Sequence, residues 1–413
     1  MRTLFICVFL FIGIVGSAQR ECGYSRYTDQ QKSSDAAFAN RLVAIETYLA
    51  QKNNLVTSRT ENSGEEPVIR IPVVVHILYN NASQNISDAQ VKSQMDALNR
   101  DFRKLNADTS NIPSRFKQYA ADIKIEFFLA KADPKGRATS GILRKQTHVT
   151  EWNLDDKIKF ALQGGSDAWD SRYYLNIWVG YMRGTMGYSS SPGSDPAKDG
   201  VVISPNVFGT MNVSSPFHLG RTATHEVGHW LGLKHIWGDT YCGDDLVDDT
   251  PKQGGYTTGC PTSFRTSCNN GETGDMYMNY MDYTNDACMN LFTHGQKTRI
   301  RSLFDAGGPR YTLLQSKGLN DPWLEEAPVE TTPENIPDFT IYPNPATDNA
   351  VVNFDDIWIG KQFQLISSNG VVLQTVTITT KRHIIKLNGY KAGLYFIQAR
   401  NENKTLIGKL VKL

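Results

Sequence analysis

The spacing of apolar residues predicts strands in the region after residue 67. Residues 68–78 are almost wholly β-branched or aliphatic, as in a buried strand. Apolar and polar residues alternate at 123–129 and at 175–179, which predicts two half-buried strands, and a further apolar run follows at 201–203. We therefore expect a mixed sheet.

Helical patterns lie between and after these strands. Ser87 and Gln90 form a capping box in front of apolar residues that recur at the helical period. These apolar residues are Val91, Met95, Leu98, Phe102 and Leu105. A second helical stretch is predicted at 294–304. The pattern as a whole predicts an α+β domain in which helices back a twisted mixed sheet.

The segments before this domain have a different character. A basic Arg2, an apolar run at 4–15 and the small residues at 16–18 predict a signal peptide over residues 1–18. The alternative, a retained membrane anchor, is disfavoured because the run is too short to span roughly 30 Å of hydrocarbon, and no other segment is expected to span a membrane. Residues 19–59 are polar with one helical stretch at 36–49, which predicts a propeptide cut near Ser58–Arg59.

The segments after the 60–320 domain also change character. Residues 321–337 are acidic and proline-rich, which is typical of an interdomain linker. Residues 338–413 alternate short strands with turns and predict a small all-β sandwich. These strands are expected at 351–354, 363–366, 371–378, 384–387 and 394–399.

Composition narrows the class of protein. The 413 residues include 43 Lys and Arg against 42 Asp and Glu, a net charge of +1, and 40% of them are hydrophobic. This balance is typical of a globular protein of two or three domains and argues against a nucleic-acid partner, because phosphate binding needs concentrated positive charge.

Cysteine usage fits an exported chain. Beyond the predicted signal peptide, four cysteines cluster and one stands apart at Cys22. The clustered residues are Cys242, Cys260, Cys268 and Cys288. Four clustered cysteines in an exported protein predict two disulfides, with three possible pairings. Cys22 is then left over and needs an explanation.

The strongest chemical signal is the run from His225 to His235. His225 and His229 are one helical turn apart, so both imidazoles can bind one Zn²⁺, while Glu226 can accept a proton from water at the metal. Gly232 permits a break in the helix that brings His235 back as the third ligand. Three protein ligands leave a position open, which is typical of catalytic zinc. His76, inside an apolar strand, is expected to be a core histidine and not a ligand.

This motif, followed by Asn279-Tyr280-Met281-Asp282-Tyr283, resembles a metzincin zinc metallopeptidase of the pappalysin family, in particular its bacterial members of the ulilysin type. The resemblance runs from about residue 68 to 304. It implies that Met281 forms a floor beneath the zinc and that Tyr283 lies near the metal or the oxyanion. It also implies the pairings Cys242–Cys268 and Cys260–Cys288. Core packing is the alternative role for Met281 and Tyr283.

The last 75 or so residues resemble the sorting domain of type IX secretion substrates. The resemblance rests on Tyr342-Pro343-Asn344-Pro345-Ala346, Gly393-Leu394-Tyr395-Phe396 and the final Lys409-Leu410-Val411-Lys412-Leu413. It implies secretion to, or beyond, the surface of a Gram-negative bacterium through the type IX machinery. A carbohydrate-binding or adhesive sandwich is the alternative.

The predicted function is that of a secreted zinc endopeptidase, acting on proteins or peptides and made as a latent proenzyme. The resemblance implies a preference for Arg or Lys after the cleaved bond, and Asp286 is our candidate for the acidic pocket, with a helix cap or a solvated carboxylate as the alternative. The rival function is a catalytically silent adhesin on a peptidase scaffold. Glu226 argues against the rival, because a silent protein has no need of the base.

Two further metal contacts are expected. Cys22, in Arg20-Glu21-Cys22-Gly23, resembles a cysteine switch whose thiolate caps the zinc in the proenzyme; a lipid-bearing cysteine is the alternative. Four carboxylates lie just after the zinc motif, at Asp244, Asp245, Asp248 and Asp249. Crowded carboxylates favour Ca²⁺, with Asp245, Asp248 and Thr250 as candidate ligands. A solvated acidic loop is the alternative.

Overall fold

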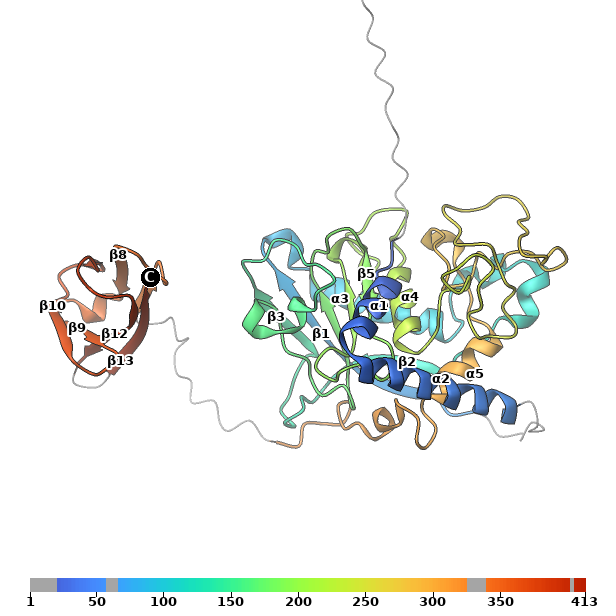
Figure 1. The fold of residues 1–413 in the computed structure, drawn as a ribbon, viewed down its shortest axis with the longest axis horizontal. Coiled ribbons are helices and arrows are strands. Elements are labelled where there is room, and N and C mark those ends of the chain that lie inside the picture. The colour runs from blue at the N-terminus through green and yellow to red at the C-terminus, as the bar shows by residue number, and fades with distance from the viewer. Residues whose placement is uncertain (1–20, 57–65, 325–338, 402–404) are drawn as a thin grey trace, which may run out of the picture. The chain divides into compact units, whose positions relative to one another are not determined.

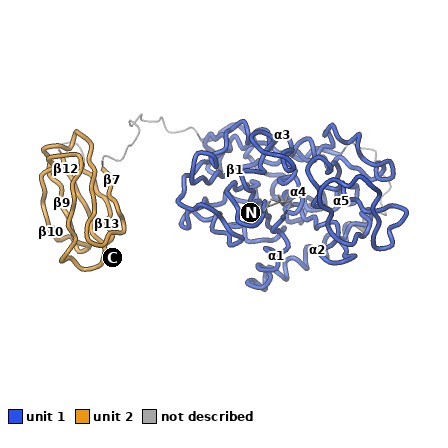
Figure 2. The backbone as a smooth tube through the Cα atoms, turned by 90° about the horizontal axis from the view of Figure 1, so that it is seen from above, with its two compact units in different colours: residues 1–326 blue, residues 327–413 orange. Residues whose placement is uncertain are grey.

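The protein, studied as a computed structural model, is described for residues 21–56, 66–324, 339–401 and 405–413. It divides into two compact units, residues 1–326 and 327–413 (Figure 2). The predicted signal peptide, the predicted cleavage point at Ser58–Arg59 and residues 325–337 of the predicted linker lie outside the described residues. Trp323 and Leu324 still donate backbone hydrogen bonds to the carbonyl of Gly136 in the first unit. Among the described residues, no helix has the length and apolar character to cross a membrane.

The first unit is built on a mixed sheet with strand order β2-β1-β4-β6-β5, with β3 beside the second half of β1. The strands are β1 (Ile69–Tyr79), β2 (Ile125–Leu129), β3 (Ile142–Gln146), β4 (Leu175–Val179), β5 (Gly187–Ser189) and β6 (Val201–Ile203). All neighbours run parallel except β5, which is antiparallel to β6 and forms one edge of the sheet. The predicted mixed sheet is confirmed.

One strand departs from its predicted character. Alternation predicts a half-buried strand at 175–179, but all five residues of β4 are buried. The reason is position, because β4 lies between β1 and β6 and both faces of the sheet are covered there. Central parallel strands are buried on both faces, whatever the identity of their polar residues.

Helices cover the sheet and extend the unit (Figure 1). They are α1 (Tyr24–Ser34), α2 (Ala36–Val56), α3 (Asp88–Phe102), α4 (Arg221–Trp230) and α5 (His294–Ser302). The Ser87 side chain caps α3 by accepting from Gln90 N. The other half of the predicted capping box is wrong, since the Gln90 side chain donates to the carbonyls of Pro205 and Phe208 instead. Leu105 lies beyond the end of α3 and is 69% exposed.

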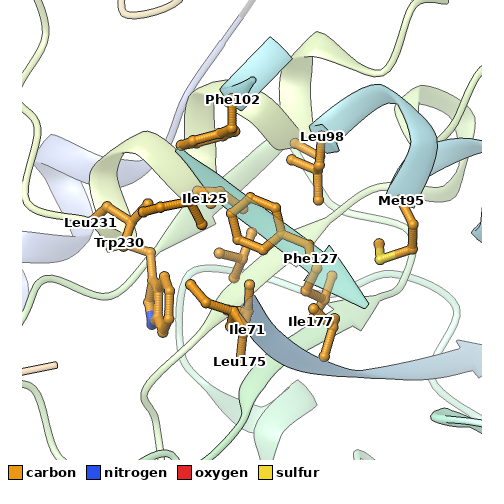
Figure 3. Packing of buried hydrophobic residues seen from close by; sticks show 14 of the residues in the cluster. Ile71, Met95, Leu98, Phe102, Ile125, Phe127, Leu175, Ile177, Trp230 and Leu231 are labelled. Atoms are coloured by element: carbon orange, nitrogen blue, oxygen red, sulfur yellow. The ribbon is translucent and has the colours of Figure 1, made fainter. Parts of the chain in front are cut away.

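The core of this unit packs α3 and the end of α4 against the sheet (Figure 3). Its members include Ile71, Met95, Leu98, Phe102, Ile125, Phe127, Leu175, Ile177, Trp230 and Leu231. Burying each side chain of this size is worth about 1.5–3 kcal/mol. The packing fixes α4, the helix that carries most of the histidine motif, against a rigid support.

The predicted propeptide forms two helices on the surface of this unit. The predicted helical stretch at 36–49 is longer in the structure, where α2 ends at Val56. The helix α1 is not predicted from the sequence, because most of its residues are polar. Tyr24, Tyr27 and Thr28 are nevertheless buried. α1 lies beside β5, and α2 lies beside α5. The prosegment is thus part of the folded unit.

The second unit is an all-β region of two antiparallel sheets, ordered β10-β9-β12-β13 and β11-β8-β7. The strands are β7 (Phe339–Tyr342), β8 (Asn349–Phe354), β9 (Gln362–Ser367), β10 (Val372–Thr377), β11 (Arg382–Lys386), β12 (Gly393–Arg400) and β13 (Thr405–Lys412). Their core surrounds the fully buried Trp358. β7 and β13 lie outside the predicted strand ranges.

Candidate active site

The helix α4 presents the first two histidines of the motif. Every residue of α4 is buried, so its side chains face the interior of the unit. The Nε2 atoms of His225 and His229 lie 3.1 Å apart. Because the two histidines are one helical turn apart, their Nε2 atoms face the same position, as the spacing predicts.

A turn after α4 brings in the third histidine. The helix ends at Trp230, and Gly232 has a φ of +79°, a conformation that costs glycine little. The Arg299 side chain donates to the Gly232 carbonyl over 2.7 Å and holds this turn. His235 Nε2 then lies 3.1 Å from His229 Nε2.

The opposite ring nitrogens fix the orientation of all three histidines. Nδ1 of His225 faces the carbonyl of Tyr280 at 2.7 Å, and Nδ1 of His229 faces that of Leu233 at 2.8 Å. Carbonyl oxygens only accept, so each Nδ1 carries the proton and each Nε2 presents a lone pair. Nδ1 of His235 lies 2.6 Å from the Asp239 carboxylate. Such outer partners are typical of metal-binding histidines.

The three Nε2 atoms fit a zinc ion. Tetrahedral Zn–N bonds of about 2.0–2.1 Å separate two ligand nitrogens by about 3.3 Å, close to the 3.1 Å found here. Burial lowers the pKa of His229, which keeps the ring in the neutral form that binds metal. The donor set therefore fits a three-histidine zinc site.

Met281 lies directly beneath the metal-binding helix. It is fully buried, and a Cβ added to Gly228 would lie 2.5 Å from its sulfur. Asn279 fixes the turn, since its side chain accepts from Met281 N and its carbonyl from Asp282 N. Gly228 is thus required by close packing of α4 on Met281.

Three further side chains meet at the histidines. Sγ of Cys22 belongs to the same cluster, in which its ligand atom and those of the three histidines all lie within 4.8 Å of one another. Burial, and then the charge of Glu226, raise the pKa of the Cys22 thiol, so a thiolate here requires a neighbouring cation. The Tyr283 hydroxyl donates to the Cys22 carbonyl over 3.5 Å.

Aromatic rings enclose this cluster. Tyr24 stacks on His229 with ring centres 3.9 Å apart, and Trp237 stacks on His235 at 4.4 Å. Tyr283 lies edge-on to Trp237 at 4.8 Å. Flat contacts of this kind restrict ring rotation, so they support the orientation set by the hydrogen bonds.

The first residues of the predicted propeptide are bound to the edge of the sheet beside this site. Gly23 N donates to Gly187 O over 2.8 Å, and Met186 N donates to Glu21 O over 2.8 Å. Residues 21–23 therefore pair with Met186 and Gly187, at the start of the edge strand β5, in the manner of an added strand. A Cβ on Gly187 would approach Glu226 Cγ to 3.2 Å, which places this edge against the candidate base.

Comparison with known proteins assigns the chain to a family. The family of pregnancy-associated plasma protein-A, a peptidase family, matches residues 162–305, and the secretion system C-terminal sorting domain matches residues 340–413. An extracellular metalloprotease of Pyricularia oryzae is 30% identical over 285 residues, which cover 66% of this chain and 86% of that protein. The chain belongs to the pappalysin family of metallopeptidases.

Solved structures extend this likeness to the precursor. Mature mirolysin of Tannerella forsythia, in complex with a cleaved peptide, is 50% identical with a TM-score of 0.59, covering 60% of this chain and 97% of that chain. A promirolysin variant of the same organism is 45% identical with a TM-score of 0.65, covering 72% and 97%. This pappalysin therefore has the form of a zymogen, and its last residues form a secretion sorting domain.

The pappalysin fold also decides the cysteine pairing. Cys242 is bonded to Cys268 and Cys260 to Cys288, so the pairing implied by the resemblance is confirmed. Cys22 is unpaired and buried. His76 is satisfied within the core, with Ser166 Oγ 2.9 Å from Nδ1 and Asn176 Oδ1 3.1 Å from Nε2.

The four carboxylates of the acidic loop have different surroundings. Asp245 is buried and accepts from Thr250 Oγ1, while Asp248 is exposed. Asp249 accepts from Thr293 Oγ1 and Gly295 N at the start of α5, and Asp244 lies 3.3 Å from the Lys252 ammonium group. Only part of the predicted calcium set, Asp245 and Thr250, is thus brought into contact.

The structure places Asp286 at the start of the metal-binding helix. Its carboxylate is fully buried and accepts from the backbone amides of Leu219 at 2.7 Å and Arg221 at 3.3 Å. The Arg221 guanidinium also donates to the Asp286 carbonyl. Both contacts correspond to the helix-capping alternative.

Several residues of the site lie outside the spaced motif. Tyr24, Trp237 and Asp239 surround the histidines, and of these three only Asp239, with Gly238, belongs to the residues that carry the family resemblance. β5 has three residues, too few for a periodic pattern. These contacts depend on the fold and not on local spacing.

Proposed function

We propose that the protein is a secreted zinc endopeptidase that is made as a latent precursor. The observation that supports this proposal best is the convergence of three histidine Nε2 atoms near the buried carboxylate of Glu226. His229 Nε2 lies 3.1 Å from His225 Nε2 and 3.1 Å from His235 Nε2. Membership of the pappalysin family supports a metallopeptidase. When bound, zinc would polarise the scissile carbonyl and acidify the attacking water.

Glu226 is the general base of this proposal. Its buried carboxylate acts on the Cys22 thiol, whose sulfur clusters with the metal-binding nitrogens. It accepts the proton of the attacking water and then delivers it to the leaving amine. The Tyr283 hydroxyl, on the same side as Cys22, donates a hydrogen bond to the oxyanion that develops on the carbonyl.

The test is a Glu226→Ala variant of the processed enzyme. Cleavage of casein should fall by about 10²–10⁴-fold, while zinc content and the unfolding midpoint stay near the wild-type values, because no ligand is lost. Glu151→Ala serves as the control, since Glu151 is a surface carboxylate paired with Arg183. Wild-type turnover in the Glu226 variant, after contaminating peptidases are excluded, would overturn the assignment.

Latency follows from the position of Cys22. A thiolate at the open position displaces the attacking water, and residues 21–23 occupy the edge strand β5. A Cys22→Ala precursor should therefore cleave substrate before its prosegment is removed. A precursor of this variant that stays as latent as the wild type would count against the switch. Maturation is proposed near Ser58–Arg59.

Specificity for Arg or Lys after the cleaved bond is supported by the family resemblance. Asp286 would provide the acidic group, although its carboxylate already binds two amides at the start of α4. Cleavage of a denatured proteome should show enrichment of Arg or Lys on the primed side, and an Asp286→Asn variant should lose it. If no such enrichment is found in the wild type, the specificity proposal is wrong.

A calcium ion at the acidic loop is proposed at Asp245 and Thr250, with Asp248 as a third ligand. Burial raises the pKa of Asp245 to about 7, a cost that a bound cation would offset. Calcium at 100 times its Kd would add about 2.7 kcal/mol of stability. An Asp245→Asn variant should lose the rise in unfolding midpoint caused by Ca²⁺ at constant zinc, whereas Asp244→Asn should keep it. An unchanged wild-type midpoint would eliminate the site.

The sorting domain sets the location. The proposed host is a Gram-negative bacterium whose type IX machinery carries the chain to the cell surface or beyond, where the domain is removed. Deletion of residues 338–413 should leave the peptidase in the periplasm of such a cell. Unchanged export of the truncated chain would contradict this route.

A further inference from the structure

Tyr27, in the predicted propeptide (the prosegment, described for residues 21–56), is buried among residues 66–324 of the first unit, which we call the catalytic part. Tyr27 is 1% exposed and belongs to a cluster of buried apolar side chains whose other described members all come from beyond the prosegment. Those members are Leu78, Trp152, Ile158, Trp178, Met182, Tyr188 and Val202. Removal of the prosegment would therefore uncover a pocket that has the shape of a tyrosine side chain.

The pocket provides both a hydrogen-bond acceptor and a hydrogen-bond donor for the hydroxyl group of Tyr27. The Tyr27 hydroxyl donates to Asp156 Oδ1 over 2.8 Å and accepts from Lys159 Nζ over 3.1 Å. Gln31, one helical turn along α1, also donates to it. Burial raises the pKa of the Tyr27 phenol, so the proton needed for the bond to Asp156 stays in place.

The pocket also matches the aromatic ring. Lys159 Nζ lies 4.8 Å from the ring centres of both Tyr27 and Tyr188, and these two rings are 4.7 Å apart. Cation–π contacts are strengthened when the ammonium group is desolvated, as that of the fully buried Lys159 is. A phenol is therefore the side chain that uses every feature of this pocket.

The charged groups of the pocket keep partners when Tyr27 leaves. Lys159 is fully buried, forms an ion pair with Asp156 at 2.9 Å and donates to the Lys198 carbonyl over 2.7 Å. Its ammonium group also lies over the ring of Trp178. None of these groups belongs to the prosegment, so they stay paired with one another after the prosegment is removed.

The edge strand β5 connects the pocket to the reaction site. Gly187 faces Glu226, and Tyr188, the next residue, points to the opposite face of the sheet and forms the pocket wall. Tyr27 N donates to the carbonyl of Gly23, which itself pairs with Gly187. Tyr27, which fills the pocket, thus lies one helical turn after Gly23, which is bound next to the zinc site. At this point α1 lies beside β5 (Figure 1).

We propose that in the processed enzyme this pocket is a substrate subsite that binds a tyrosine side chain of the protein being cleaved. The proposal rests on the proposed peptidase function and on removal of the prosegment. A polypeptide paired along β5 directs alternate side chains to the two faces of the sheet, so one of them reaches Tyr188 while the scissile bond faces Glu226. The Tyr27 hydroxyl contacts would be made by the substrate phenol.

The experiment uses the processed enzyme and a set of fluorogenic peptides with one constant cleavable bond. Tyr, Phe or Ala is placed in turn at each of the other positions. At one position, Tyr should give a kcat/KM at least about 10-fold above Ala and several-fold above Phe, because buried hydroxyl partners left unpaired disfavour Phe. The gain should appear mainly in KM.

Matched variants then locate the preference. Asp156→Asn and Lys159→Met should bring the ratio of Tyr to Phe close to one, while Asp155→Asn and Lys157→Met should leave it unchanged, because those two neighbours pair with each other at the surface. Asp156 and Lys159 are buried, so their variants must first show a wild-type unfolding midpoint. If they do not, the comparison of Tyr, Phe and Ala in the wild type decides alone.

The outcomes separate this proposal from the peptidase function. Absence of cleavage of every peptide would refute the function itself. Cleavage with no position that prefers Tyr to Ala and Phe would overturn the subsite. So would a preference that survives at the same ratio in well-folded Asp156→Asn and Lys159→Met enzymes. A synthetic peptide of residues 19–34 that inhibits less after Tyr27→Ala, with no Tyr preference among substrates, would assign the pocket to latency only.

Discussion

Replacement of Gly228 by alanine tests how closely the metal-binding helix rests on Met281. The new Cβ would lie 2.5 Å from the Met281 sulfur and 3.6 Å from Leu233 Cδ1. Both Gly228 and Met281 are buried, so relief requires the core to shift. Overpacking of this kind costs about 1–3 kcal/mol.

The helix gains something from the same change. Alanine is favoured over glycine in a helix interior by about 1 kcal/mol, so the net destabilisation by Gly228→Ala should be at most about 2 kcal/mol. That corresponds to a fall in Tm of several degrees. In a Met281→Ala background, which itself costs about 2–5 kcal/mol, the clash is gone. There Gly228→Ala should stabilise the protein by about 1 kcal/mol.

The assay is a double-mutant cycle on the zinc-loaded precursor. Unfolding midpoints of the wild type, Gly228→Ala, Met281→Ala and the double variant give the coupling energy, which should equal the clash of about 1–3 kcal/mol. Gly255→Ala is the control, because its Cβ would meet nothing within 4 Å. Equal destabilisation by Gly228→Ala in both backgrounds would refute the packing of Met281 beneath α4.

Three further predictions concern charged groups. Burial lowers the pKa of His76 from 6.5 to about 4. His76 therefore contributes up to about 3 kcal/mol of stability above pH 6.5, and this contribution is lost as the pH falls towards 4. In a His76→Gln variant, the free energy of unfolding measured in urea should depend less on pH between 6.5 and 4. Asp239→Ala should raise the zinc Kd by about 10–100-fold in a chelator competition, because His235 loses its partner; an unchanged Kd would contradict that role. Glu46→Gln should weaken inhibition by the prosegment about 5-fold, since Glu46 pairs with the nearly buried Arg299 but is itself 32% exposed; equal inhibition constants would show that the pair is not needed.

The sequence alone determines the features that depend on local spacing. His225 and His229 meet because one helical turn separates them, and Gly232 marks the break that returns His235. The mixed sheet follows from apolar runs, since a strand or helix period records which face is buried. The burial of β4 on both faces does not follow, because it depends on the neighbours that the chain supplies from elsewhere.

Only the tertiary structure decides contacts between distant segments. Tyr27 and Lys159 are 132 residues apart, and Glu46 and Arg299 are 253 residues apart. Counting cysteines leaves three pairings open, and packing of the loops on the unit selects one. α1 is polar in composition, yet it buries Tyr24 and Tyr27 because the catalytic part of the unit supplies the complementary surface. A periodic pattern in the sequence indicates which face of a helix or strand is buried. Which other segment packs against that face is decided only when the whole unit folds.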